Sequence, residues 1–187
     1  MYGSALAQKL SIVALLSGWI VASLAAQLPR PELAIKTEFV LRFPEFVEWP
    51  VASADARPLS LCLSPAQPFG RSVHESLSAQ TRGRRITVHE LRPGESARTC
   101  DALYVASADL SLLNDIGDRP ILTIGDQPNF CQRGGIINLL VVDGRVRFEI
   151  ELSRARRAGL KMDSQLLRLA SKVHGGRNPS PEGAWKQ

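Results

Sequence analysis

A two-residue turn, Asp143-Gly144, constrains this chain more than any other local feature. It separates two apolar runs, residues 136–142 and 145–152, and an Asp-Gly pair in that position is a strong signal for a β-hairpin. The core face of the hairpin is then predicted from pairing across the turn: Val141 with Val146, Leu139 with Phe148, and Ile137 and Ile150 beside them. The other face mixes aliphatic, amide and charged side chains, which suits partial cover by a helix or a partner.

Short apolar runs alternate with helical periodicity along the rest of the chain. The predicted strands are residues 59–63, 86–91, 101–106 and 120–124. The predicted helices are residues 35–48, 70–79 and 108–116, a short basic helix or turn at 153–159, and a final helix that Asp163 caps and whose apolar face reaches Val173. This order predicts an α/β fold, a single layered domain whose mixed β-sheet is flanked by helices and whose C-terminal β-hairpin is followed by a helix.

The first of these helices is amphipathic. Its apolar face is predicted to carry Ile35, Phe39, Val40, Phe43, Phe46 and Val47. Pro44 lies inside the pattern and should kink or restart the last turn, and Trp49-Pro50 ends the helix. Leu41 falls on the polar face and is a candidate for dimer or partner contact. Trp49 is open to two interpretations, core packing or surface contact.

The N-terminal residues 1–25 are typical of a secretory signal peptide. Lys9 precedes an apolar run of about 15 residues, which is short for a membrane span of roughly 20, and small residues allow cleavage near Ala25. An uncleaved N-terminal anchor is the alternative. The predicted mature domain covers residues 26–174 and is exported, and residues 175–187 are predicted to be a disordered tail.

Export gives the three cysteines, Cys62, Cys100 and Cys131, a possible role in disulfide bonding. An odd number allows at most one internal bridge and leaves one thiol. Cys62 lies in one predicted strand and Cys100 opens another, so two neighbouring strands can bring them within bridging distance. The alternative is that all three thiols are free and buried.

The sequence lacks the motifs of common enzyme classes. It contains no G-x-S-x-G elbow, phosphate loop or dinucleotide fingerprint, and its three histidines are never spaced as a metal-ligand pair. Glu149 and Glu151 point the same way from one strand, but an exposed strand face explains them without catalysis. The net charge of +5 is spread among acidic residues, which disfavours nucleic-acid binding. We therefore expect a binding protein without a cofactor or metal, and not an enzyme.

Several ordered segments together resemble the YfiR-like family of small periplasmic proteins. The segments that carry the resemblance are Phe46–Pro50, Leu61–Leu63, Cys100–Val105, Leu122–Asp126, Gly134–Asn138, Arg147–Ile150 and Gln165–Ala170. The resemblance implies an α/β domain in the periplasm that often dimerises. It also places Cys62 and Cys100 at the family's bridge positions, and it leaves Cys131 without the partner that a second bridge would need.

The resemblance further implies a regulatory role through protein contact. Family members repress an inner-membrane diguanylate cyclase of the YfiN type, which lowers cyclic di-GMP and restrains biofilm formation, and an outer-membrane lipoprotein of the YfiB type can sequester them. The expected partner-binding residues, taken to be partly exposed, are Glu48 and Trp49 at the helix exit, Glu149 and Leu152 on and beside the outer strand face, and Lys161 and Asp163 in a turn. The alternative is a small-ligand sensor module with a pocket at the edge of the sheet.

Overall fold

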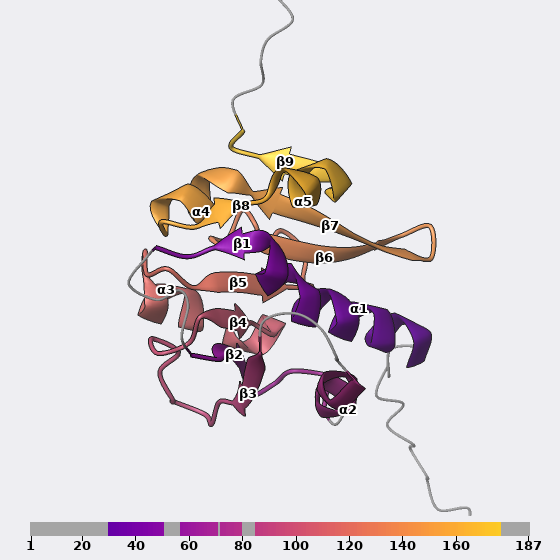
Figure 1. Ribbon diagram of the computed structural model, residues 1–187, viewed down its shortest axis with the longest axis vertical. Coiled ribbons are helices and arrows are strands. Elements are labelled where there is room, and N and C mark those ends of the chain that lie inside the picture. Colours follow the sequence, from indigo (N-terminus) through magenta and orange to yellow (C-terminus); the bar gives the residue numbers. More distant parts are fainter. Residues whose placement is uncertain (1–29, 51–56, 71, 80–84, 177–187) are drawn as a thin grey trace, which may run out of the picture.

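A seven-stranded mixed β-sheet forms the centre of the protein in the computed structural model, which describes residues 30–50, 57–70, 72–79 and 85–176. The strands are β2 (Leu59–Leu63), β3 (Ile86–Glu90), β4 (Ala102–Tyr104), β5 (Leu122–Gly125), β6 (Ile137–Val142), β7 (Arg145–Glu151) and β9 (Lys172–His174). Their spatial order is β3-β2-β4-β5-β6-β7-β9, seen from bottom to top in Figure 1. The predicted signal peptide and most of the predicted tail lie outside the described residues.

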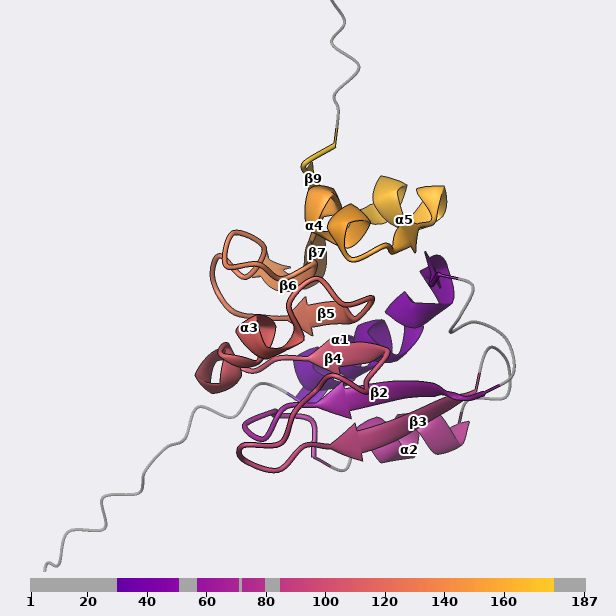
Figure 2. The same cartoon turned by 90° about the vertical axis from the view of Figure 1, so that its left-hand side faces the viewer.

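The helices lie around this sheet. They are α1 (Arg30–Arg42), α2 (Ser72–Ala79), α3 (Leu112–Ile116), α4 (Leu152–Arg157) and α5 (Ser164–Leu169), with 3-10 turns η1 (Phe43–Phe46) and η3 (Ser107–Asp109). Figure 2 shows α4 and α5 gathered at the β9 end of the sheet and α2 near β3 at the other end. All neighbouring strands are parallel except β6 and β7, which confirms the predicted α/β fold with a mixed sheet.

Alternation along the strands divides the core into two clusters. Leu61 and Leu63 of β2 join the cluster that contains residues of α1 and α2, whereas Cys62 between them joins the cluster that contains residues of α3. Tyr104 and Leu103 of β4 divide in the same way. Because successive side chains of a strand point to opposite faces, helices cover both faces of the sheet, as the nearly all-apolar central strands require.

The hairpin has the register that the sequence predicts. Val141 pairs with Val146, Leu139 with Phe148, and Ile137 with Ile150. Asp143 and Gly144 have φ values of 50° and 69°, and positive φ at both central residues defines a type I′ turn. Leu139 and Phe148 are buried, but Val141, near the tip, is 46% exposed, so the core face ends before the turn.

The first helix ends earlier than predicted, at Arg42, but most of its predicted apolar face is confirmed, because Val40 and Phe43 are buried and Phe39 packs against the core. Pro44 restarts the chain as the 3-10 turn η1, and Phe43 packs edge-on against Phe148 with ring centroids 5.1 Å apart. Ile35, however, is 47% exposed, while Leu41 is completely buried. Leu41 is therefore not available for partner contact in this chain. The buried side of the helix also carries Lys36. Burial of this lysine is tolerated because ion pairs with Glu32 and Asp126 compensate its charge.

The C-terminal segment contains a strand that the sequence pattern did not indicate. Asp163 caps α5 as predicted, accepting a hydrogen bond from the backbone N–H of Gln165 at 2.6 Å. The helix then ends at Leu169, and Val173 belongs to β9, not to the helix. β9 pairs in parallel with β7 and forms one edge of the sheet. β9, which ends at His174, is the last strand in the part of the chain that the structure describes.

Candidate functional site

A small two-stranded ribbon joins two segments that were predicted separately to contact a partner protein. Its strands are β1 (Val47–Glu48) and β8 (Lys161–Met162), which run antiparallel with Glu48 opposite Lys161. The backbone N–H of Asp163 extends the connection by donating a hydrogen bond to the carbonyl of Phe46 at 2.9 Å. Glu48, Lys161 and Asp163 therefore form one continuous surface, which we call the β1–β8 ribbon.

The ribbon presents charged side chains to solvent. The side chains of Glu48 and Lys161 are 79% and 82% exposed, and their charged atoms lie 3.9 Å apart. Asp163 is also exposed, and Leu169 at the end of the adjoining helix α5 is 69% exposed. A single exposed leucine is ordinary on a protein surface and an exposed ion pair is weak, so these side chains are available for contact with a partner but do not by themselves identify one. Leu169 was not predicted to be a contact residue, because its spacing fitted a buried helix face.

Three of the six predicted contact residues are buried. Trp49, Glu149 and Leu152 are 7%, 9% and 8% exposed, so the expectation that they are partly exposed is wrong for this chain. Trp49 is part of the core cluster, and the adjacent Pro50 lies close to Gly159 just before β8. Trp49 thus packs in the core next to the β1–β8 ribbon, and it supports the ribbon from the inside instead of contacting a partner.

Glu149 belongs to a polar group on β6, β7 and β9. Its carboxylate accepts a hydrogen bond from the Asn138 amide at 3.0 Å and lies 2.8 Å from Nε2 of His174. Burial acts to raise the pKa of Glu149, but the hydrogen bonds from His174 and Asn138 and the charge of Lys172 outweigh it and lower that pKa. Glu149 is therefore a charged residue that helps to hold β9 on the sheet.

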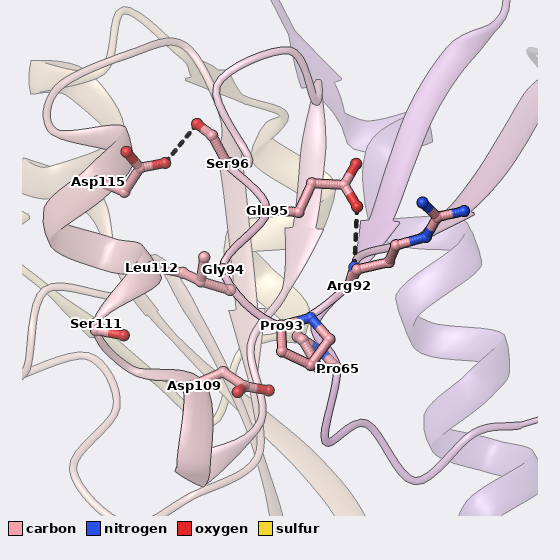
Figure 3. Close-up of a pocket in the computed structure, with 10 residues that line it drawn as sticks. All are labelled: Pro65, Arg92, Pro93, Gly94, Glu95, Ser96, Asp109, Ser111, Leu112 and Asp115. Carbon is pink, nitrogen blue, oxygen red and sulfur yellow. Dashed lines mark hydrogen bonds between the residues drawn. The ribbon is translucent and has the colours of Figure 1, made fainter.

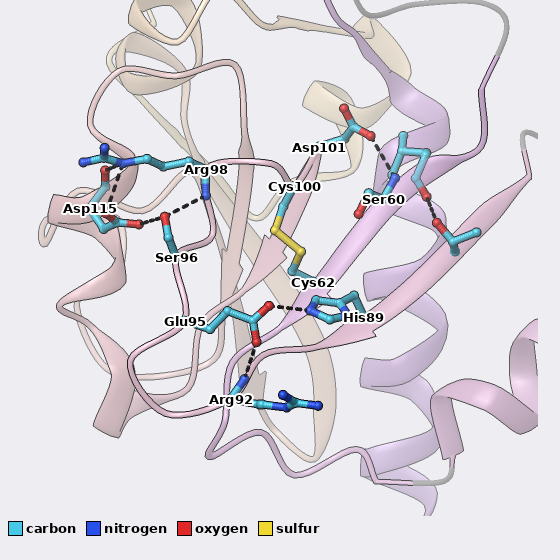
Figure 4. The surroundings of a disulfide bond; sticks show 12 residues. Ser60, Cys62, His89, Arg92, Glu95, Ser96, Arg98, Cys100, Asp101 and Asp115 are labelled. Atoms are coloured by element: carbon cyan, nitrogen blue, oxygen red, sulfur yellow. Dashed lines mark hydrogen bonds and ion pairs between the residues drawn. A yellow bond between two sulfur atoms is a disulfide. The ribbon is translucent and has the colours of Figure 1, made fainter.

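The predicted disulfide is present between Cys62 on β2 and Cys100 just before β4, with Cα atoms 5.9 Å apart. Figure 4 shows it beside the loop that leads from β3 to β4. A carboxylate oxygen of Glu95 in this loop lies 2.8 Å from Nε2 of His89 on β3. The bridge ties the end of this loop to β2, the strand next to the edge strand β3. The alternative of three free thiols is therefore wrong.

The third cysteine, Cys131, is free and buried. Its thiol lies 3.7 Å from the carbonyl of Ile136, and burial raises its pKa to about 12. The thiol is therefore protonated at neutral pH, and a protonated thiol is a poor nucleophile and metal ligand. Within the described residues, no group of three or more His, Cys, Asp or Glu side chains could hold a metal ion.

A cavity of about 430 Å³ lies at the carboxyl ends of β2 and β3 (Figure 3). Pro65 follows β2, the segment 92–96 follows β3, and Asp109, Ser111, Leu112 and Asp115 come from the region of η3 and α3. The connection after β2 leads to β3 on one side, and the connection after β4 leads to β5 on the other, so the carboxyl ends of β2 and β4 form a topological switch point. Such switch points are where open α/β sheets commonly bind small ligands.

A second polar group that sequence reasoning missed joins α1 to the end of β5. Lys36 Nζ lies 2.9 Å from a carboxylate oxygen of Asp126, and the Tyr104 hydroxyl donates to the other Asp126 oxygen at 2.6 Å. A lysine in the middle of an amphipathic helix and an aspartate directly after a buried strand give no signal of pairing, because they are 90 residues apart in sequence. Only the fold brings them together.

Comparison with known proteins identifies the family. A model of YfiR/HmsC-like domains matches residues 33–171, which is most of the chain. The chain belongs to the YfiR/HmsC-like family. Members of this family are periplasmic regulators of diguanylate cyclase systems. None of the helices in the described residues is long and apolar enough to cross a membrane.

Among solved structures, the chain is similar to a conserved domain protein from Vibrio cholerae O1 biovar El Tor. The two are 13% identical, with a TM-score of 0.48. The match covers 75% of this chain and 60% of that one, so the YfiR/HmsC-like chain spans about three fifths of the length of that structure.

Proposed function

We propose that this YfiR/HmsC-like protein is a periplasmic repressor that binds the sensor domain of an inner-membrane diguanylate cyclase of the YfiN type. The match to the family over residues 33–171 carries this proposal. Binding would hold the cyclase inactive, keep cyclic di-GMP low and restrain biofilm formation. An outer-membrane lipoprotein of the YfiB type would relieve repression by competing for the repressor, and a second copy of the chain would form a homodimer.

The β1–β8 ribbon is the surface that best suits the contact with the cyclase. It carries exposed charges of both signs, Glu48 and Lys161, and Asp163 beside them. Leu169 adds apolar area that a partner could cover. The ribbon is also held by backbone hydrogen bonds and backed by the buried Trp49, so it is rigid before binding, which reduces the entropic cost of association.

Repression by binding requires a difference in affinity between two states of the cyclase. The repressor shifts the cyclase towards the inactive state only if it binds that state more tightly. A shift from almost fully active to almost fully inactive needs about 5 kcal/mol of differential binding free energy. The ribbon must therefore contact a part of the sensor domain that changes between the two states.

The test is cellular cyclic di-GMP in a strain that lacks this gene, and in the same strain complemented with exported and non-exported forms. A repressor predicts that cyclic di-GMP rises on deletion and returns to normal only with the exported form. No change on deletion, in a strain whose YfiN-type cyclase is intact, would refute the proposal. Co-purification of the cyclase with a tagged, exported chain would establish the contact directly.

The cavity at the carboxyl ends of β2 and β3 favours a second candidate, a small-ligand sensor. Its place at a switch point of the sheet is the specific observation. The disulfide ties down the loop that lines it, so a ligand would meet a largely preformed site. Thermal stabilisation of the purified protein by a small molecule, in the absence of any protein partner, distinguishes this function from the first.

A further inference from the structure

Strand β6 is longer than its neighbour β5 and extends beyond the end of it. β5 ends at Gly125, which pairs with Asn138, whereas β6 continues to Val142. Beyond Asn138, β6 pairs only with β7 among the described strands. Figure 1 shows the β6–β7 hairpin projecting past the rest of the sheet. The β5 side of this projection is therefore an open strand edge.

The hydrogen-bond pattern identifies which backbone groups line that edge. The N–H of Glu151 donates to the carbonyl of Ile136, so this pair is hydrogen-bonded across β6 and β7. In an antiparallel ladder, bonded and non-bonded pairs alternate. Asn138, Leu140 and Val142 thus direct their backbone groups towards β7, and Val141 directs its N–H and carbonyl outward, along the line in which β5 would continue.

The open edge differs in composition from the two outer edges of the sheet. β3 carries His89 and Glu90, and β9 carries Lys172 and His174, and charged or polar side chains on edges discourage pairing with other chains. The segment 139–142 is entirely aliphatic, and Val141 and Val142 are 46% and 47% exposed. This edge therefore lacks the side chains that protect the other two.

A cavity of about 470 Å³ lies against the open edge. Leu139 and Val141 line it from one face of the hairpin, and Asn138 lines it from the other, together with Asn129 and Gln132 of the loop after β5. Asn138 is completely buried and donates to Glu149, but its Oδ1 accepts no hydrogen bond within the described part of the chain. Because buried acceptors are nearly always satisfied, this atom marks a place for a hydrogen-bond donor.

We propose that the open edge of β6 binds an extended peptide segment of a partner protein as an added β-strand. The added strand would hydrogen-bond with the outward N–H and carbonyl of Val141, as edge-binding peptides do in other sheets. Its side chains would alternate between apolar groups against Leu139 and Val141 and hydrogen-bond donors towards Asn138 Oδ1. This inference stands independently of the proposed repression of a cyclase.

The test uses the whole folded protein and a synthetic probe, a fluorescent, end-blocked peptide of alternating valine and threonine. The control peptide has N-methylated valines, which cannot donate hydrogen bonds. Val141→Pro removes the outward N–H without removing a bond to β7, and Val141→Thr keeps that N–H at similar side-chain size. Fluorescence anisotropy measures affinity, and amide hydrogen exchange in the unmodified protein locates the bound peptide.

The proposal predicts that the probe binds the native protein and slows exchange of the Val141 amide. Val141→Pro should weaken binding at least about tenfold, whereas Val141→Thr should change it less than about threefold. Three results would each overturn the proposal: no binding at millimolar probe, equal binding of the N-methylated peptide, or protection of β3 or β9 amides instead. If thermal unfolding shows that Val141→Pro does not fold, hydrogen exchange in the unmodified protein and the comparison of the two peptides still test the proposal.

Discussion

The ammonium group of Lys36 lies 2.9 Å from a carboxylate oxygen of Asp126, although only 5% of the lysine side chain is exposed. The same Nζ lies 2.9 Å from Glu32, one turn earlier on α1. Burial acts to lower the pKa of Lys36, but hydrogen bonds to Asp126 and Glu32 outweigh it and raise that pKa. The pair fixes α1, and with it the entry into β1, to the carboxyl end of β5.

Lys36→Met should destabilise the protein by about 3 kcal/mol, because methionine keeps the volume but leaves Asp126 partly buried without its cation. Urea unfolding followed by tryptophan fluorescence measures the change in the free energy of unfolding. The matched control is Arg42→Met, which removes the exposed ion pair with Glu38 on the same helix and should change stability little. Equal effects of the two substitutions would contradict a structural role for the buried pair.

Loss of the disulfide should cost about 4 kcal/mol, since the bridge closes a separation of 38 residues and restricts the unfolded chain. Thermal unfolding with and without reductant measures this. The native protein and the Cys131→Ala variant should both lose stability on reduction, because both contain the bridge between Cys62 and Cys100. The double variant Cys62→Ser with Cys100→Ser should already be destabilised and should not respond to reductant. A response in that variant would mean that Cys131 contributes to redox sensitivity.

Stability should fall with acidification through the titration of Glu149. Its pKa is lower in the folded protein than in the unfolded chain, so the unfolded chain binds more protons between the two values. The contribution is therefore complete above the ordinary glutamate pKa of 4.5 and is lost as the pH falls below it through the pKa of the folded protein. Glu149→Gln should reduce this loss when urea unfolding at neutral pH is compared with urea unfolding at acidic pH. Glu90→Gln, on the outer strand β3, is the control, and an unchanged pH dependence in Glu149→Gln would refute the prediction.

Gly135→Ala should destabilise the protein by roughly 2 kcal/mol, because a Cβ there would overlap the ring of the buried Phe130. Gly144→Ala should cost about 1 kcal/mol for a different reason. Its φ of +69° disfavours any side chain, although a Cβ would meet no atom within 4 Å. Urea unfolding ranks the two variants, and the opposite ranking would show that the loop around Phe130 can relax.

Lys161→Glu should raise cellular cyclic di-GMP if the β1–β8 ribbon contacts the cyclase, because it places like charges at Glu48 and position 161 and reverses the surface potential there. The fold should persist, since the side chain is 82% exposed. Arg85→Glu, an equal charge change at the far edge of the sheet, should leave cyclic di-GMP unchanged. The same increase for both variants would indicate an effect of net charge and would remove the ribbon from the proposed interface.

Local patterns predicted the parts of the fold that local interactions determine. The Asp143-Gly144 turn set the hairpin register correctly, because turn type and strand alternation act over neighbouring residues. The period of α1 predicted most of its buried face, but the burial of Lys36 was missed, because it depends on the distant Asp126. β9 was missed because Lys172–His174 is too short to show a period, and its place on the sheet comes from pairing with β7.

In the candidate site, too, local patterns predicted some features, whereas others depend on contacts between distant segments. Glu48, Lys161 and Asp163 were each selected on separate segments, but no local signal showed that β1 and β8 pair. The exposure of Trp49 and Leu152 could not be judged from sequence either. Their surroundings are built by residues far along the chain, such as Gly159 beside Pro50. The disulfide was predictable because cysteine pairs are few and the family resemblance indicated which two form it.

Pairing of β1 with β8 has a consequence for the timing of folding. Val47 can pair with Met162 only after nearly the whole domain has been synthesised, and contacts of such long sequence separation form late because a long loop must close first. The β1–β8 ribbon therefore does not exist on a truncated or half-folded chain. If the ribbon is the repressor surface, only completely folded molecules can inhibit the cyclase, so inhibition also indicates that folding of the repressor is complete.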